Sequence, residues 1–90
     1  MINFYEMTEM IKHKSAIIID VRSRQEFYEG HINGAVNIPL IDVKTQIKKY
    51  AYNKNQPIIL YCNAGTRSMK GKKILEQIGY KEVYVLEPIY

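Results

Sequence analysis

The chain has one cysteine and two histidines among its 90 residues. A single cysteine excludes an internal disulfide framework, which favours a reducing compartment such as the cytoplasm. So few soft ligands also argue against a zinc site, and we expect neither a metal nor a cofactor. The first residues lack the basic and apolar segments of a signal peptide, and no apolar run is long enough for a membrane span. We therefore predict a cytoplasmic protein without a membrane partner.

The positive charge of the chain is modest and dispersed. The formal net charge is +4, and no aromatic-rich basic motif accompanies the lysines. We therefore expect no nucleic-acid partner, and we interpret the lysines as solvated helix faces. A modest positive field would also favour a small anionic substrate. The length and the 47% hydrophobic content suit one domain over residues 1–90.

Apolar patterns predict alternating strands and helices. Strands are expected at 2–5 (a short edge strand), 16–19, 35–38, 58–61 and 83–86. Helices are expected at 8–14, 23–29, 41–51 and 66–78. Thr8 is a candidate cap for the first helix, and Ser23 with Glu26 forms a capping box for the second. This alternation predicts an α/β fold with a mainly parallel sheet, in which Asp20 and Cys62 lie at the same edge.

The stretch around the cysteine has the pattern of a strand, a tight loop and a helix. The apolar run 58–61 ends at Cys62, and only four residues separate Cys62 from Arg67. So short a loop must curl, which turns its amide N–H groups inward at a helix N-terminus, where anions bind. These donors and Arg67 would lower the pKa of Cys62 and favour the nucleophilic thiolate. The alternative, a small buried hydrophobe, does not explain the polar residues of the loop.

Three segments, in this order, are typical of one family. They are Asp20-Val-Arg22, Gly30-His-Ile-Asn-Gly-Ala35 and Cys62-Asn-Ala-Gly-Thr-Arg-Ser68. With them the chain resembles the rhodanese family, and in particular its single-domain thiosulfate sulfurtransferases. The resemblance implies a three-layer fold with helices on both sides of the sheet.

The resemblance also implies a reaction and its residues. Cys62 would take the outer sulfur of thiosulfate as a persulfide and pass it to cyanide, a thiol or a protein acceptor. The rest of the loop would bind the anionic donor, with Arg67 orienting it and favouring thiosulfate over mercaptopyruvate. These binding residues are Asn63, Ala64, Gly65, Thr66, Arg67 and Ser68.

Four residues outside the loop are expected to support the structure. Asp20 and Arg22 would tie the strand end to neighbouring loops, and Arg22 would pair with Glu26. His31 would form a hydrogen bond to the backbone rather than act in catalysis. The family often continues after its last strand with a helix, whereas this chain has Glu87-Pro88-Ile-Tyr90. We therefore predict a C-terminal helix that is shortened or absent, with part of one sheet face thinly covered and suited to a partner or a dimer contact.

Two other functions stay open at this point. One is a non-catalytic module or single-turnover carrier that docks to a partner and relays persulfide from the same loop. The other is a cysteine phosphatase or arsenate reductase. The loop is one residue shorter than that of a cysteine phosphatase, and Tyr61 stands where such enzymes have a histidine. Both features favour a single bound sulfur atom over a phosphate.

Overall fold

The computed structural model of the protein describes residues 1–88. Over these residues four strands form one sheet in the order β2-β1-β3-β4, and every ladder between them is parallel. The strands are β1 (Ile17–Asp20), β2 (Val36–Asn37), β3 (Ile58–Tyr61) and β4 (Val83–Val85). The predicted α/β fold with a parallel sheet is confirmed.

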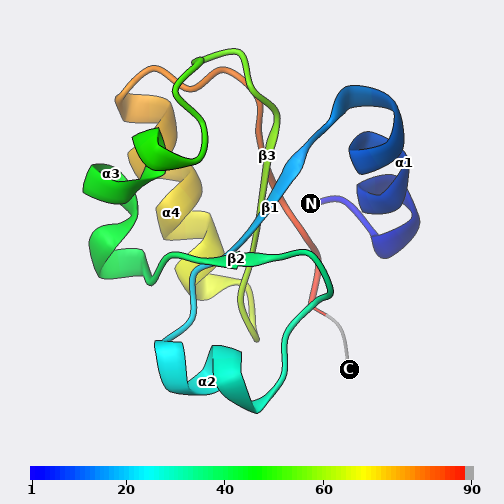
Figure 1. The fold of residues 1–90 in the computed structure, drawn as a ribbon, viewed down its shortest axis with the longest axis vertical. Helices are drawn as coiled ribbons and strands as arrows, with labels where there is room; N and C mark the ends of the chain where they lie inside the picture. The colour runs from blue at the N-terminus through cyan, green and yellow to red at the C-terminus, as the bar shows by residue number, and fades with distance from the viewer. Residues whose placement is uncertain (89–90) are drawn as a thin grey trace.

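Helices cover both faces of the sheet. The α-helices are α1 (Phe4–Lys14), α2 (Arg24–Glu29), α3 (Val43–Gln46) and α4 (Thr66–Gln77), and 3-10 turns at η1 (Leu40–Asp42) and η2 (Ile47–Lys49) flank α3. In Figure 1, α3 and α4 lie on one side of the strands and α1 on the other, which gives the three expected layers. Within residues 1–88, none of the helices is both long and apolar enough to cross a bilayer.

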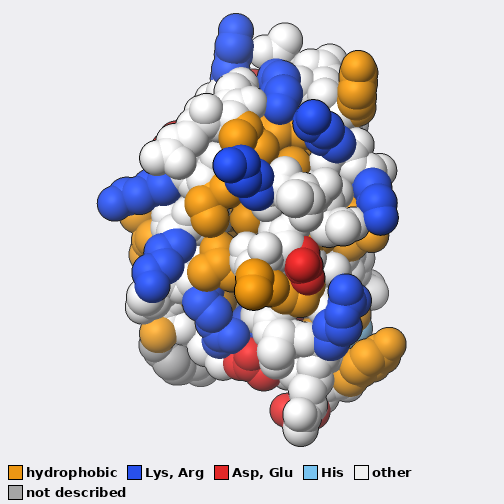
Figure 2. All heavy atoms as spheres, turned by 90° about the vertical axis from the view of Figure 1, so that its left-hand side faces the viewer, with side chains coloured by type: hydrophobic (Ala, Val, Ile, Leu, Met, Phe, Trp, Pro, Cys, Tyr) orange, Lys and Arg blue, Asp and Glu red, His pale blue; other side chains and the backbone are white. Residues whose placement is uncertain are grey.

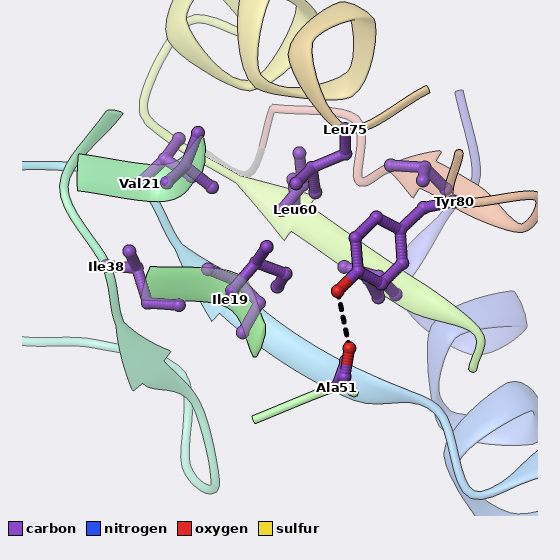
Figure 3. Close-up of a cluster of buried hydrophobic side chains, with 11 residues drawn as sticks. Ile19, Val21, Ile38, Ala51, Leu60, Leu75 and Tyr80 are labelled. Carbon is purple, nitrogen blue, oxygen red and sulfur yellow. Dashed lines mark hydrogen bonds between the residues drawn. The ribbon is translucent and has the colours of Figure 1, made fainter. Parts of the chain in front are cut away.

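Strand alternation divides the core between the two faces of the sheet. Ile19, Ile58 and Leu60 belong to the larger cluster, which also contains Leu75 of α4. The intervening strand residues belong to a second cluster with Met7 of α1, as expected for side chains that alternate across a sheet. Figure 3 shows the larger cluster, where the hydroxyl of buried Tyr80 donates to the carbonyl of Ala51. The sheet is thus buried on both faces and offers a rigid support for residues at its edge.

The first helix begins earlier than predicted. Residues 2–5 are not a strand, and Thr8 is not the cap. Asn3 caps α1 instead, and Glu6 completes a capping box with it. Only Ile2 keeps an extended role, in a single parallel bridge to Leu86.

Two further differences concern residues 41–51 and the C-terminus. The predicted continuous helix at 41–51 is divided into η1, α3 and η2. From Leu86 to Pro88 the described chain contains no helix, in agreement with the prediction of a reduced C-terminal element. The last part of the predicted tail, residues 89–90, lies outside the described residues. The sheet face with the second cluster is covered by α1, whose Met7 is fully buried.

Candidate active site

Cys62 lies at the carboxyl end of β3, the central buried strand. All four residues of β3 are buried, and Tyr61 pairs in register with Asp20 at the end of β1. The prediction that Asp20 and Cys62 lie at one edge of the sheet is therefore confirmed. Cys62 itself is half-buried, so it stays accessible to small molecules.

The loop after Cys62 surrounds the sulfur with hydrogen-bond donors. The amide of Gly65 donates to Sγ at 3.1 Å, and the amide of Ser68 at 3.4 Å. Gly65 caps α4 in the left-handed region with φ +96°, a conformation that a residue with a side chain rarely adopts. This turn is what directs the first amides of α4 at the sulfur. The backbone cradle predicted from the loop length is present.

These contacts change the acidity of the thiol. Burial alone would raise the pKa of Cys62. The hydroxyl and amide of Ser68, with the amides of Gly65 and Arg67, outweigh that effect and lower its pKa. The site therefore favours a thiolate, the form that attacks sulfur.

Ser68 is the buried partner of the sulfur. Its side chain is fully inaccessible, and its Oγ lies 3.4 Å from Sγ and 3.0 Å from the carbonyl oxygen of Gly65. Its single hydroxyl proton can be donated either to that carbonyl or to the sulfur. The hydroxyl can therefore accept a hydrogen bond from the thiol and donate one to the thiolate. Ala64 and Thr66, predicted to bind substrate, are exposed on the outside of the loop.

Arg67 does not point at the sulfur. Its two terminal nitrogens donate to the Glu26 carboxylate of α2 at 2.7 and 3.0 Å. The predicted ion pair between Arg22 and Glu26 is therefore wrong, because the Glu26 carboxylate binds Arg67 instead. This bidentate contact and the Ser23 amide hold the pKa of Glu26 at about 2. Arg67 thus fixes the loop to α2, and its role in orienting the donor stays a prediction.

Asn63 joins this contact to a second ion pair. Its amide nitrogen donates to Glu26 at 3.0 Å, and its oxygen accepts from Arg22 at 3.3 Å. Arg22 in turn contacts both oxygens of the buried Asp20 carboxylate, the shortest contact being 2.7 Å. It also donates to the carbonyl of Gly30, so the predicted tie between the strand end and its neighbouring loop is confirmed.

His31 lies beside this network, on the rim of the site. Its Nδ1 is 2.8 Å from the carbonyl oxygen of Phe27, and its ring stacks on that of Phe27 with centroids 3.6 Å apart. The predicted hydrogen bond to backbone is confirmed. Because a carbonyl oxygen can only accept, Nδ1 of His31 carries a proton. The hydroxyl of Tyr61 accepts from the Ile32 amide, and burial raises the pKa of Tyr61 to about 12.

A pocket of about 370 Å³ opens above the sulfur. Its lining residues are Arg22, Gly30, His31, Ile32, Tyr61, Cys62, Asn63, Leu86 and Glu87. Leu86 and Glu87 were not predicted from the sequence to belong to the site. They follow β4, whose carboxyl end shares the edge of Cys62, so the same rule of strand direction would have found them. The pocket is large enough for a small anion or thiol and carries both a guanidinium and a carboxylate.

Comparisons with known proteins agree with this geometry. Thiosulfate sulfurtransferase PspE of Escherichia coli strain K12 is 43% identical over 65 residues, which are 72% of this chain and 62% of that protein. The tRNA uridine(34) hydroxylase of Buchnera aphidicola (strain Tuc7) is 36% identical over 86 residues, but these are only 26% of its length. The chain thus spans less than two thirds of either relative.

Solved structures and a family model agree as well. The structure described as rhodanese with anions from E. coli matches with TM-score 0.72 and 39% identity over 80% of this chain and 82% of that one. The human single-domain sulfurtransferase TSTD1 matches with TM-score 0.85 over 99% and 89% of the two chains, although at 23% identity it supports the fold alone. The model of the rhodanese-like domain matches residues 4–88. The chain belongs to the rhodanese-like domain family.

Proposed function

We propose that this protein is a sulfurtransferase that carries a sulfane sulfur on Cys62 as a persulfide. The observation that carries the proposal is the cradle of amide and hydroxyl donors around Sγ, which lowers the pKa of the thiol. Apolar burial of a cysteine would not require these donors. A sulfur atom added to Sγ would remain next to the same loop, where its negative charge is stabilised.

In the first step the Cys62 thiolate attacks the outer sulfur of thiosulfate. A new S–S bond forms to Cys62 while the bond between the outer sulfur and the sulfonate sulfur breaks. The electron pair of that bond leaves with sulfite, and the persulfide keeps one negative charge. Sulfite is a stable anion, so departure needs no general acid. This is consistent with a site in which His31 is bound to backbone.

In the second step an acceptor removes the outer sulfur. Cyanide attacks this sulfur, the S–S bond breaks, and thiocyanate leaves while the Cys62 thiolate is regenerated. A thiolate acceptor reacts in the same way and departs as a persulfide. The two displacements replace one difficult transfer by two easier ones. Because the thiolate returns to its cradle, the same donors serve both half-reactions.

The similar proteins support this reaction class. PspE is named a thiosulfate sulfurtransferase, and the E. coli rhodanese structure is described with anions. Both descriptions fit a donor that is a small anion. We propose thiosulfate as the donor for this chain, acting in the cytoplasm.

An intact-mass measurement tests the proposal. The protein is incubated with thiosulfate, and we expect a gain of one sulfur atom that cyanide then removes. Cys62→Ala should abolish both sulfur loading and cyanide-dependent turnover, with an unchanged circular dichroism spectrum. Sulfur loading that persists in a folded Cys62→Ala protein would exclude Cys62 as the carrier.

A single-turnover carrier is a second candidate. The observation in its favour is the charge at the pocket, where Arg22 is already paired with Asp20 and Glu87 adds a carboxylate. A pocket with these charges attracts a dianion such as thiosulfate only weakly. Steady-state turnover with thiosulfate and cyanide separates the two candidates, because a carrier loads once from a persulfide donor and shows little continuous turnover. Cys62 carries the sulfur in both candidate functions, so either result of the turnover measurement is compatible with that role.

A further inference from the structure

A second hollow lies on the face formed by η1, α3 and α4. It has a volume of about 480 Å³ and is lined by Leu40, Ile41, Lys44, Ile74, Gln77 and Ile78. One side of Leu40, Ile74 and Ile78 packs against the larger core cluster. The other side of these residues forms the floor of the groove. Ile41 is 91% exposed at its rim. An isoleucine this exposed beside an apolar groove is typical of a contact surface rather than of a core.

The charge around the groove is almost all of one sign. Apart from Arg67, which pairs with Glu26, residues 40–81 contain eight lysines and two carboxylates, Asp42 and Glu76, and Glu76 is already paired with Lys72. Lys44 lines the groove itself. Lys70 and Lys73 are exposed on α4, four residues before Ile74 and Gln77, so they lie on the same face of the helix. Figure 2 shows this face, with hydrophobic side chains in its middle, many lysine and arginine side chains around them, and a few Asp and Glu side chains among these.

We propose that this groove binds an acidic amphipathic helix of a partner protein. Apolar side chains of the helix would fill the groove between Leu40 and Ile78, and its carboxylates would contact the surrounding lysines. Grooves between helical segments commonly receive such a helix, whose anchors recur at one face. The complementary charge selects an acidic helix over a basic one.

The concave shape favours a protein helix over a lipid surface. A peripheral membrane helix buries a protruding apolar face in the bilayer, whereas here three of the apolar residues form a floor. The groove is also separate from Cys62. Ile74 is eight residues along α4 from Thr66, which corresponds to about 12 Å of helix. The inference therefore does not depend on the proposed sulfur chemistry.

The test uses the whole chain and a synthetic helix. The probe is a peptide of ~15 residues with leucines on one face and glutamates beside them, a length that can sustain a helix. A shuffled peptide of the same composition, whose leucines share no face, is the control. We expect amide chemical-shift changes at the groove residues on titration with the probe but not with the shuffled peptide. We also expect the affinity to fall as salt rises from ~0.05 to ~0.5 M.

Variants on two faces make the test specific. The double variant Ile41→Ser/Lys44→Glu changes two exposed side chains of the groove and should weaken the affinity at least about tenfold, or 1.4 kcal/mol. The matched variant Tyr5→Ser/Lys12→Glu lies on α1, which Figure 1 places on the other side of the sheet, and should bind as the unaltered protein does. Sulfur loading by thiosulfate should be equal in all three proteins.

Three results would overturn the inference. The first is equal binding by the groove variant and the unaltered protein. The second is binding of anionic phosphatidylglycerol vesicles, but not of the peptide, through the same residues. The third is a dimer in sedimentation velocity that Ile41→Ser/Lys44→Glu dissociates, because this face would then bind a second copy of the chain.

Discussion

Two guanidinium–carboxylate pairs lie beside the Cys62 loop and differ in almost every respect. Asp20 and Arg22 are two residues apart, and the Asp20 side chain is fully buried. Glu26 and Arg67 are 41 residues apart, and their side chains are 30% and 37% exposed. The first pair closes the end of one strand. The second connects α2 to the loop that holds the sulfur.

The two ion pairs should therefore have different roles, one in the stability of the fold and the other in the position of the Cys62 loop. A buried pair broken on one side leaves a charge without a partner in a medium that solvates it poorly. A partly exposed pair loses less, because water replaces the missing partner. We therefore expect Asp20 to matter most for the fold and Glu26 for the geometry around Cys62.

The largest effect is expected for Asp20→Asn. This change leaves Arg22 without its carboxylate and should lower the free energy of unfolding by ~3–5 kcal/mol. Urea denaturation followed by circular dichroism measures it. Glu29→Gln, at an exposed position of α2, is the control and should stay within about 0.5 kcal/mol of the unaltered protein. A similarly small effect for Asp20→Asn would remove the distinction between the two pairs.

Glu26→Gln should have a smaller effect that depends on pH. The loss of charged hydrogen bonds to Arg67 should cost about 1–3 kcal/mol at neutral pH. The pKa of Glu26 is lowered from 4.5 to about 2 in the folded protein, so its contribution is present above pH 4.5 and disappears as the pH falls toward 2. Unfolding curves over this range should show the two proteins converging. A difference that stays constant down to pH 2 would mean that ionisation of Glu26 is not its source.

Ser68→Ala tests the hydroxyl that lies against the sulfur. The variant removes a hydroxyl that lowers the pKa of Cys62, so that pKa should rise. The pH midpoint of iodoacetamide alkylation should therefore move upward, and unfolding should become easier by about 1 kcal/mol. An unchanged midpoint would show that the backbone amides alone set the acidity of the thiol. Ser15→Ala, at the exposed end of α1, is a suitable control.

The smallest effect is expected for a change at Glu87. It is an exposed carboxylate at the pocket and takes part in none of the ion pairs found within residues 1–88. Its repulsion of a dianion about 8 Å away in water amounts to about 1 kcal/mol, so Glu87→Gln should lower the KM for thiosulfate by about two- to fivefold. The effect should shrink as salt rises. A higher KM would indicate that Glu87 helps to bind the donor instead.

The sequence predicted the local features of the site well. The apolar run before Cys62 marks β3 with its correct bounds, and the Ser23–Glu26 capping box marks the start of α2. Counting the residues between Cys62 and Arg67 predicted an inward-facing backbone. All three inferences use neighbours in sequence, where spacing determines geometry.

Contacts between distant segments were not predictable in the same way. Arg22 and Glu26 have the spacing of a helical pair, yet Arg22 precedes α2 and lies instead against Asp20. Arg67 reaches Glu26 only because β1 and β3 are adjacent in the sheet. The start of α1 was missed for a related reason. Ile2 has an extended role that depends on Leu86, whereas Asn3 already caps a helix.

The Ile2–Leu86 bridge has a consequence for the order in which the chain folds. Its two hydrogen bonds, from the Ile2 amide to Val85 and from the Glu87 amide to Ile2, close a loop of nearly the whole chain. Closing so long a loop costs chain entropy that two hydrogen bonds repay poorly, so the bridge should form late and open first. The methyl group of Met1 lies close to Gly65, only 3.1 Å from where a Cβ atom on that residue would be. Each opening of the bridge therefore releases the neighbour of Gly65 on the Cys62 loop, and amide exchange at Ile2 would report how often the loop loses this neighbour.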